Sequence, residues 1–269
     1  MTLVDALILG LLQGFTEFLP VSSSGHLVLA QRLLNLNGEL LTFDVYVHFG
    51  TLLSVVAVFW KDILAIIKST VSALLSPHWK QHYLDDPNAR LGFALIVATI
   101  PAGVVGLTYR NAVEAAFTDP KLVGMNLVIT GLILFLTRLS GPVPEKRPGI
   151  FSGILIGIAQ AFAILPGISR SGSTISTALY LRISPVQAAR FSFLMSIPVI
   201  GGASLLETIK IFKHGTDVGI LTILVGTVVS AISGYISIKV LLSIVQRGKL
   251  NWFAFYCLLV GSFGILFIT

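Results

Sequence analysis

Apolar residues along this chain of 269 residues gather in runs that are long enough to cross a lipid bilayer, with short polar stretches between them. A helix needs about 20 mainly apolar residues to span the hydrocarbon core. The pattern predicts six spanning helices, over residues 43–60, 91–109, 121–139, 191–208, 218–242 and 252–269. The loop over residues 61–90 begins with an amphipathic stretch, which is typical of a helix that lies on the membrane surface.

Near the N-terminus, polar residues and a proline interrupt two shorter apolar runs. Residues 3–19 end at Pro20, and the second run, residues 27–36, follows the polar segment 22–26. At about 1.5 Å per residue the two runs reach roughly 25 Å and 15 Å, which is short of a ~30 Å core. We therefore expect a re-entrant helical hairpin, since a broken helix at membrane depth is tolerated where protein or a wet cavity surrounds it.

The same pattern restarts after a linker over residues 141–149 that is rich in proline and glycine. Four pairs of polar or helix-breaking residues match at an offset of 146 or 147: Gln13 with Gln160, Pro20 with Pro166, Ser22 with Ser169, and Gly25 with Gly172. Each half then holds one re-entrant hairpin and three spans. We predict a single membrane domain over residues 1–269, with one repeat at about 1–140 and the other at about 150–269.

An odd number of spans in each half forces the two halves to lie inverted in the membrane. If the N-terminus is on one side, that side carries 5 of the 18 lysines and arginines, and the opposite side carries 12. The excess of positive charge marks the cytoplasmic side, so both termini are predicted to lie outside. The predicted fold class is therefore an all-α integral membrane protein with an inverted-topology repeat, and its two hairpin tips meet near the bilayer midplane.

Composition supports this class and excludes others. The chain is 55% hydrophobic and 11% charged, whereas soluble domains are about 25% charged. The net charge of +6 is interpreted as loop charge that sets topology, so we expect membrane lipids and not nucleic acid as partners. Residues 1–30 contain no lysine or arginine and are interpreted as part of the fold, and the single cysteine excludes an internal disulfide.

Arg170 is the only charged residue between Arg147 and Arg182. An arginine near the centre of a membrane helix costs roughly 2.5–3.5 kcal/mol, so it marks a candidate functional site. Four hydroxyl residues surround it: Ser169, Ser171, Ser173 and Thr174. A guanidinium beside a helix N-terminus suits a phosphate group. The alternative, an arginine that snorkels or pairs in a kinked helix, does not require these hydroxyls.

The first hairpin tip supplies groups for acid–base chemistry. Gln13 and Glu17 are four residues apart and share a helix face. Glu17 can act as a general base or hold a divalent cation, and His26 can transfer a proton near neutral pH. Three serines are candidates for the nucleophile or for hydrogen-bond donors to phosphate: Ser22, Ser23 and Ser24. An anion clamp, a nucleophile, a base and an acid are the parts of phosphoryl transfer. Asp44 and His48 flank the start of a span and are interpreted as interfacial residues.

Two motifs carry a resemblance to a known family. Residues 13–26, Gln-Gly-Phe-Thr-Glu-Phe-Leu-Pro-Val-Ser-Ser-Ser-Gly-His, resemble an (E/Q)xxxE motif with its following serines and histidine. Residues 166–174, Pro-Gly-Ile-Ser-Arg-Ser-Gly-Ser-Thr, resemble a PGxSRSxxT motif. Both motifs, their order and the chain length are similar to those of the undecaprenyl-diphosphate phosphatases of the bacitracin-resistance (BacA/UppP) type.

The resemblance implies a multi-pass enzyme of the bacterial inner membrane that converts undecaprenyl diphosphate to undecaprenyl phosphate, the carrier lipid for peptidoglycan, with an active site open to the outside. By its place in the motif, Ser23 is the predicted nucleophile and Glu17 activates it, directly or through a metal. His26 would protonate the leaving phosphate. The predicted substrate-binding residues, besides the catalytic Arg170, are Gln13, Ser22, Ser24, Ser169, Ser171, Ser173 and Thr174.

Gln13 departs from many members of that family, which carry glutamate there. A site with two carboxylates is then not expected, but Mg²⁺ or Ca²⁺ can bind Glu17 and the lipid diphosphate together. A transporter or flippase for a polyprenyl phosphate is the alternative function, because inverted repeats with broken helices are a transporter architecture. Ser176 stands where acid-phosphatase-like lipid phosphatases need a histidine, which excludes that class. The sequence leaves open which of the three serines attacks, and whether the chain works as a homodimer.

Overall fold

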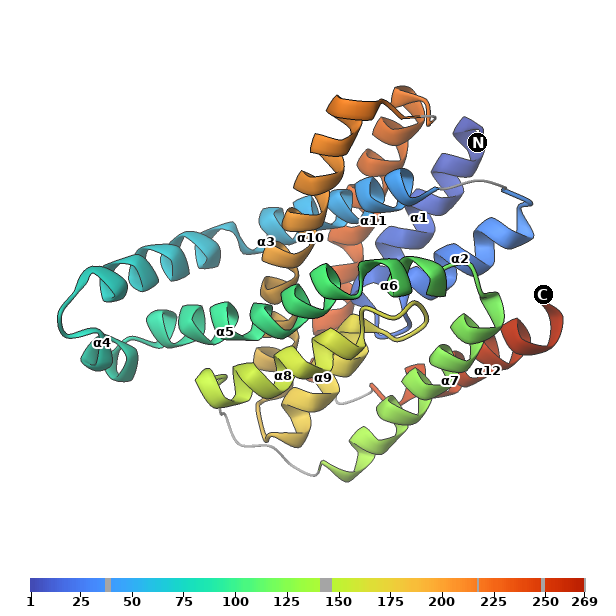
Figure 1. Cartoon of the computed structure of the whole chain (residues 1–269). Coiled ribbons are helices and arrows are strands. Elements are labelled where there is room, and N and C mark those ends of the chain that lie inside the picture. Colours follow the sequence, from blue (N-terminus) through green and yellow to red (C-terminus); the bar gives the residue numbers. More distant parts are fainter. Residues whose placement is uncertain (37–39, 141–146, 217, 248–249, 269) are drawn as a thin grey trace.

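The structure is a computed structural model that describes residues 1–36, 40–140, 147–216, 218–247 and 250–268, and within these ranges all regular elements are helices (Figure 1). Five of them are long and apolar enough to cross a membrane: α3 (Leu41–Leu75), α5 (Pro87–Thr108), α7 (Pro120–Leu136) with the 3₁₀ turn Thr137–Leu139, α10 (Pro185–His214) and α11 (Ile220–Gln246). The sixth predicted span is α12 (Trp252–Phe267), an apolar helix of 16 residues. The prediction of an all-α membrane protein is confirmed, with a last span shorter than predicted.

Both predicted hairpins are present, and each consists of two short helices around a turn. The first is α1 (Leu3–Phe18) with α2 (Ser23–Leu33), and the second is α8 (Ile150–Phe162) with α9 (Arg170–Tyr180). The second helix of each hairpin begins in the same way. Ser22 Oγ accepts the backbone N–H of Gly25 at 3.3 Å, and Ser169 Oγ accepts that of Gly172 at 3.0 Å. These serine caps satisfy N–H groups that a helix start leaves unpaired.

The loop predicted between the first two spans contains more helix than expected. α3 bends at Phe59, where the backbone leaves helical geometry, and then continues through the amphipathic stretch to Leu75. The short helix α4 (Trp79–Asp85) follows and leads into α5. Figure 1 shows this part of α3 projecting from the other helices together with α4 and the first part of α5. The amphipathic stretch is therefore a helix as predicted, but it is joined to the preceding span.

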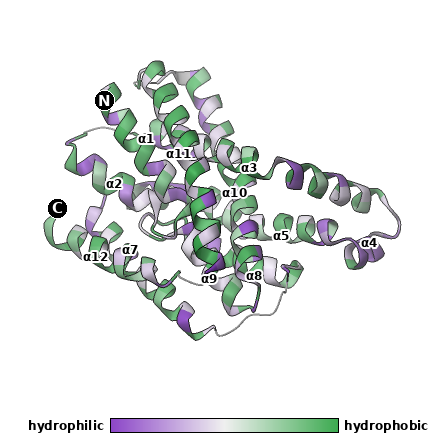
Figure 2. Ribbon diagram, turned by 180° about the vertical axis from the view of Figure 1, so that it is seen from behind, coloured by the Kyte–Doolittle hydropathy of each residue, from purple (hydrophilic) through white to green (hydrophobic). Residues whose placement is uncertain are grey.

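The outer surface of the helices is apolar. Leu64, Leu107, Phe151, Phe212 and Leu259 are each more than half exposed. Figure 2 shows that the long helices are mainly hydrophobic, whereas α4 is hydrophilic. Large exposed apolar surfaces on a soluble monomer are rare, and lipid covers such surfaces in a membrane protein.

Each hairpin packs its first helix against a spanning helix of the other half. α1 packs on α11, and α8 packs on α5. Both contacts are close: a Cβ on Gly10 would lie 2.9 Å from the carbonyl oxygen of Gly226, and one on Gly157 would lie 2.4 Å from that of Ala98. The first hairpin helix of each half thus packs on a spanning helix of the other half in an equivalent way, as the proposed repeat requires. Their inversion in the membrane stays a prediction, and residues 141–146 of the predicted linker lie outside the described residues.

Aromatic residues next to the two hairpins form part of the main core. The rings of Phe18 and Phe193 meet edge to face with centroids 5.2 Å apart, and both side chains are fully buried. Phe18 follows Glu17 in α1, and Phe193 follows Ser192 in α10. This packing fixes the backbone on both sides of the polar residues described next.

Candidate active site

The tips of the two hairpins touch each other, as predicted. A Cβ on Gly25 would lie 3.0 Å from the Cα of Gly167, so only a residue without a side chain allows this approach. Ser171 Oγ donates to the carbonyl oxygen of Leu19 at 3.1 Å. Because the turns themselves are in contact, residues of both motifs lie next to each other.

Helix α7 holds the second tip in place. Asn126 Nδ2 donates to the carbonyl oxygen of Pro166 at 2.8 Å, and Thr130 Oγ1 donates to that of Gly167 at 3.0 Å. Thr130 Oγ1 also accepts the backbone N–H of Ser169 at 3.0 Å. The sequence analysis missed both residues, although two polar residues four positions apart in an apolar helix are a signal that could have identified them.

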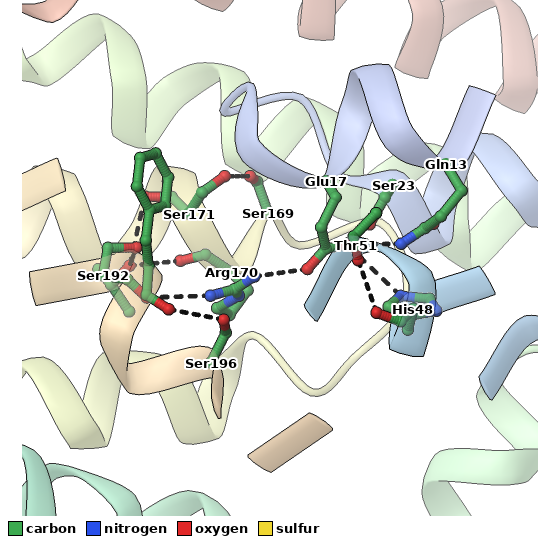
Figure 3. A network of polar contacts seen from close by, with 12 residues as sticks. Gln13, Glu17, Ser23, His48, Thr51, Ser169, Arg170, Ser171, Ser192 and Ser196 are labelled. Carbon is green, nitrogen blue, oxygen red and sulfur yellow. Dashed lines mark hydrogen bonds and ion pairs between the residues drawn. The ribbon is translucent and has the colours of Figure 1, made fainter. Parts of the chain in front are cut away.

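Glu17 is the centre of the polar network. Its Oε1 accepts from Arg170 Nη2 at 2.5 Å, whereas its Oε2 accepts from Gln13 Nε2 at 2.9 Å and from Ser23 Oγ at 2.5 Å. Figure 3 shows Arg170 on one side of the carboxylate and Gln13, Ser23 and His48 on the other. The structure thus brings together one predicted binding residue and three of the four predicted catalytic residues.

Arg170 is mostly buried and paired, as an arginine within a membrane domain requires. Besides its ion pair with Glu17, its Nη1 donates to the carbonyl oxygen of Ser192 at 3.0 Å. A guanidinium has five N–H donors in a rigid plane, so these two bonds orient the group without using all of its donors. Ser192 was missed by the sequence analysis, since its contribution is a backbone oxygen.

His48 lies in the site, so its interpretation as an interfacial residue is wrong. Its Nε2 is 3.5 Å from Glu17 Oε2, and its Nδ1 donates to the carbonyl oxygen of Asp44 at 2.7 Å. The reason is the path of α3, which begins at Leu41 and packs against α1, so that the second turn of α3 faces Glu17. A signal was present in the sequence, because His48 and Thr51 are polar residues one turn apart in an apolar run.

His26 is turned toward α12. Its Nδ1 donates to the carbonyl oxygen of Ser22 at 2.8 Å, and its Nε2 is 2.7 Å from the hydroxyl of Tyr256. The two rings are stacked, with centroids 5.5 Å apart. His26 is therefore held in one orientation by its own tip and by Tyr256, a residue that nothing in the sequence indicated.

The three serines of the first tip have different partners. Ser22 caps α2 in a left-handed conformation with φ 67°, and its Oγ is 3.4 Å from that of Ser24. Among the hydrogen bonds of the described residues, only Ser23 of these three contacts Glu17. This contact singles out Ser23 as the serine whose proton Glu17 can take.

The hydroxyls of the second tip mostly bond to protein. Ser169 caps α9, and its Oγ is 3.3 Å from that of Ser171. Thr174 Oγ1 donates to the carbonyl oxygen of Arg170 at 2.7 Å and lies 2.7 Å from Ser192 Oγ. Ser173 Oγ is buried with no partner in the structure. The binding roles of these four residues stay predictions, and Ser173 is the one with an unused hydroxyl.

The oxygens at Glu17 fit a cation that is shared with phosphate groups, but not a cage made by protein alone. The described residues contain no group of three or more histidine, cysteine, aspartate or glutamate side chains that could hold a metal ion. Gln13 Oε1, however, is fully buried without a hydrogen-bond partner, and its amide lies against Glu17. Mg²⁺ is often held by one or two protein oxygens together with substrate phosphates.

Comparisons with known proteins indicate the same family as the two motifs at the site. The family model described as "Bacitracin resistance protein BacA" matches residues 6–263. The undecaprenyl-diphosphatase of Salinibacter ruber is 44% identical over 268 residues, which cover 98% of this chain and 99% of that relative. The proteins of the same name from Halothermothrix orenii and Korarchaeum cryptofilum are 40% and 42% identical, with at least 96% of each chain covered. A match over nearly the whole length, together with both motifs at one site, shows that this chain belongs to the BacA family.

Proposed function

We propose that this chain is an undecaprenyl-diphosphatase, which hydrolyses undecaprenyl diphosphate to undecaprenyl phosphate and inorganic phosphate. The observation that carries the proposal is the buried contact of Ser23 with Glu17, which Arg170 orients from the other side. The names of the relatives agree with it. Nothing in these comparisons favours the alternative of a transporter or flippase, which would need Arg170 but not the Ser23–Glu17 pair.

The first step is attack by Ser23 on the terminal phosphorus of the lipid. Ser23 Oγ forms the new bond to phosphorus, and its proton passes to Glu17 Oε2, to which it already donates at 2.5 Å. The bond between the terminal phosphorus and the bridging oxygen breaks, and its electrons stay on undecaprenyl phosphate. A water oxygen then forms a bond to the phosphorus of the phosphoserine, and the bond between phosphorus and Ser23 Oγ breaks. The proton held by Glu17 returns to Ser23 Oγ, and inorganic phosphate leaves with the protons of the water.

Arg170 and the two helix starts stabilise the charge that develops on the phosphoryl oxygens. The guanidinium carries a full positive charge and has donors beyond those that hold Glu17 and Ser192. The N-termini of α2 and α9 meet at the same place and carry partial positive charge. Oriented donors of this kind need no rearrangement during the reaction, which is a main source of catalysis.

His26 is proposed to protonate the leaving phosphate through Nε2. Since a carbonyl oxygen can only accept, the bond to Ser22 assigns Nδ1 as a donor. His26 would therefore act as the imidazolium, which carries a second proton on Nε2, gives that proton to the leaving phosphate and takes one up again from solvent. Tyr256 occupies that nitrogen in the structure. The leaving group would therefore take the place of the tyrosine hydroxyl.

A divalent cation, Mg²⁺ or Ca²⁺, is proposed to bind at Glu17 and Gln13 together with the lipid diphosphate. When bound, it would neutralise phosphate charge that Arg170 alone cannot balance. Phosphate release by the purified protein should then stop when a chelator is added and return when excess Mg²⁺ or Ca²⁺ is supplied. Full activity of the metal-free protein in chelator would contradict this.

We further propose that the protein works in the bacterial cytoplasmic membrane with the site open to the outer face. There it would return the carrier lipid to peptidoglycan synthesis and so confer resistance to bacitracin. The apolar helices support a multi-pass membrane protein, and the charge distribution along the chain supports the orientation.

Replacement of Ser23 tests the reaction directly. Ser23→Ala should release almost no phosphate from undecaprenyl diphosphate in detergent, because the nucleophile is lost. Ser24→Ala, one residue further along the same helix start, is the matched control: it removes a predicted hydrogen bond to phosphate but not the nucleophile, so it should keep clearly more activity than Ser23→Ala. Detergent contains no compartments, so phosphate release by the wild-type protein cannot be transport. A Ser23→Ala variant that turns over at a sizeable fraction of the wild-type rate would show that water attacks instead.

A further inference from the structure

An open cavity of about 670 Å³ lies between α4, the start of α5 and the start of α8. Cavities of this size are typical of sites for small ligands. Two arginines, Arg90 and Arg147, line it, and the described residues of the lining include no aspartate or glutamate. None of the lining residues belongs to either hairpin tip, so the cavity is separate from the polar network at Glu17.

Arg90 is oriented by the end of α4. Its Nε donates to the carbonyl oxygen of Tyr83 at 3.3 Å, and its Nη2 donates to that of Leu84 at 2.5 Å. These two bonds fix the plane of the guanidinium without using all of its five N–H groups. Within the described part of the chain, neither Arg90 nor Arg147 forms an ion pair with a carboxylate. Their positive charge is therefore available to an anionic ligand.

Tyr83 fixes the opposite wall of the cavity. Its hydroxyl accepts the backbone N–H of Ile150 at 3.3 Å, and its ring meets that of Phe93 edge to face with centroids 6.0 Å apart. The N–H of Gly149 is paired as well, with Ser152 Oγ at 2.8 Å. Because these first N–H groups of α8 already have partners, the binding of an anion depends on the two arginines.

A cavity at the other end of α5 has a different charge balance. Arg110 and Lys210 line it, but so do Asp44 and Glu114. Arg110 Nε is 2.7 Å from Glu114 Oε1, so its charge is already compensated. Of these two cavities, only the one at the start of α8 has a lining of one sign.

The rim of this cavity is apolar and exposed. Leu84 and Phe151 both line it, and their side chains are 63% and 73% exposed. The apolar helices α5 and α8 both begin here, so the cavity lies where the chain passes from the apolar part of the membrane to the polar headgroups. A ligand with a phosphate and apolar chains satisfies both surfaces, whereas free phosphate would leave the apolar rim uncovered.

We propose that this cavity binds an anionic phospholipid. Arg90 and Arg147 hold its phosphate, and its acyl chains lie along Leu84 and Phe151. Anionic lipids attract arginines near the membrane surface, and in the predicted orientation this surface is the cytoplasmic one. Since α8 begins at the cavity and leads to the second hairpin tip, the lipid would also secure the hairpin that carries Arg170. The inference does not depend on the proposed function.

Native mass spectrometry of the full-length protein in an uncharged detergent tests the site. A single dioleoylphosphatidylglycerol should bind with a Kd about fivefold or more below that of dioleoylphosphatidylcholine, whose head carries its own cation. Arg147→Gln should raise the Kd for phosphatidylglycerol about fivefold or more, the effect of one arginine near an anionic lipid surface. Arg138→Gln is the matched control, because Arg138 is predicted on the same side but does not line the cavity. It should leave the Kd unchanged.

Two further measurements distinguish the phospholipid from a soluble phosphate compound. Inorganic phosphate, or glycerophosphoglycerol, which is the same headgroup without acyl chains, should not displace phosphatidylglycerol when added in molar excess. Phe151→Ser removes an apolar contact but no charge, so it should weaken binding of the phospholipid, and it keeps the test decisive if Arg147→Gln fails to fold. Displacement by either soluble compound, or unchanged binding in Phe151→Ser, would overturn the assignment to a lipid.

Equal affinity for the two phospholipids would contradict the proposal, because the arginines would then contribute nothing. An equal loss of affinity in Arg147→Gln and Arg138→Gln would contradict it as well, since binding would then follow the general charge of the surface and not this cavity.

Discussion

Arg170 uses one planar group to contact both the other half of the chain and a neighbouring helix of its own half. Nη2 reaches Glu17 in the first hairpin, and Nη1 reaches the carbonyl oxygen of Ser192 in α10. Breaking a buried ion pair by removing one partner costs about 3–5 kcal/mol, since the other charge is left uncompensated. At the scale of the residue, the guanidinium is thus a structural connection, and it is also predicted to donate hydrogen bonds to phosphate.

Arg170→Lys tests whether the shape of the guanidinium matters beyond its charge. Lysine keeps the charge but has a single nitrogen, so it cannot hold Glu17 and the Ser192 carbonyl in the same geometry. We expect phosphate release to fall roughly 10²–10³-fold, as when one oriented donor is removed. The thermal unfolding temperature, measured alongside, should show that the variant still folds. Near-normal turnover would mean that the role of Arg170 is charge balance alone.

Glycines at helix crossings determine how deeply each hairpin inserts. A Cβ on Gly157 of α8 would lie 2.4 Å from the carbonyl oxygen of Ala98 and 2.8 Å from its Cα. These are backbone atoms, so no rotation of a side chain relieves the overlap. At the scale of the element, close packing of α8 on α5 positions α9 and with it Arg170.

Gly157→Ala and Gly202→Ala form a matched pair for this packing. Both add one methyl group to a helix, so the gain in helix propensity is common to them. Nothing lies within 4 Å of a Cβ on Gly202. We expect Gly157→Ala to be less stable than Gly202→Ala by about 1–3 kcal/mol, the usual cost of overpacking. Reversible unfolding in mixed micelles measures the difference, and equal stabilities would show that α8 is free to shift.

The molecule as a whole is organised by contacts between its halves. α1 packs on α11 of the second half, and α8 packs on α5 of the first. α7 and α12 cross where a Cβ on Gly124 would lie 2.9 Å from the carbonyl oxygen of Gly261, and one on Gly261 would lie 2.7 Å from that of Gly124. The first helix of each hairpin packs mainly against the other half, and the two tips contact each other, so the site is formed by both halves.

Cysteine labelling tests the orientation of this assembly in the membrane. In a Cys257→Ala background, a cysteine at Thr2 should react with an impermeant reagent from outside, because the side with 5 lysines and arginines is predicted to be external. A cysteine at Lys80 should react only after permeabilisation. The reverse labelling pattern would contradict the predicted orientation, with both termini outside.

The sequence by itself determined the class, the elements and most of the site. Runs of apolar residues are set by what a bilayer requires, so the long helices and both hairpins were predictable. The only charge in an apolar segment and the hydroxyls beside it identified Arg170 and its tip. The matched residues of the two halves also predicted that Glu17 and Arg170 would meet.

Only the tertiary structure decided which side chains contact the carboxylate of Glu17. Ser22, Ser23 and Ser24 are equivalent by type, and only the turn of the hairpin brings Ser23 to Glu17. His26 lies against Tyr256 because α12 passes beside the first hairpin, and His48 lies against the carboxylate of Glu17 because of the path of α3. Contacts between residues far apart in the chain depend on the rotation and depth of packed helices. Those are fixed by backbone contacts such as Gly157 on Ala98, which hydrophobic periodicity does not encode.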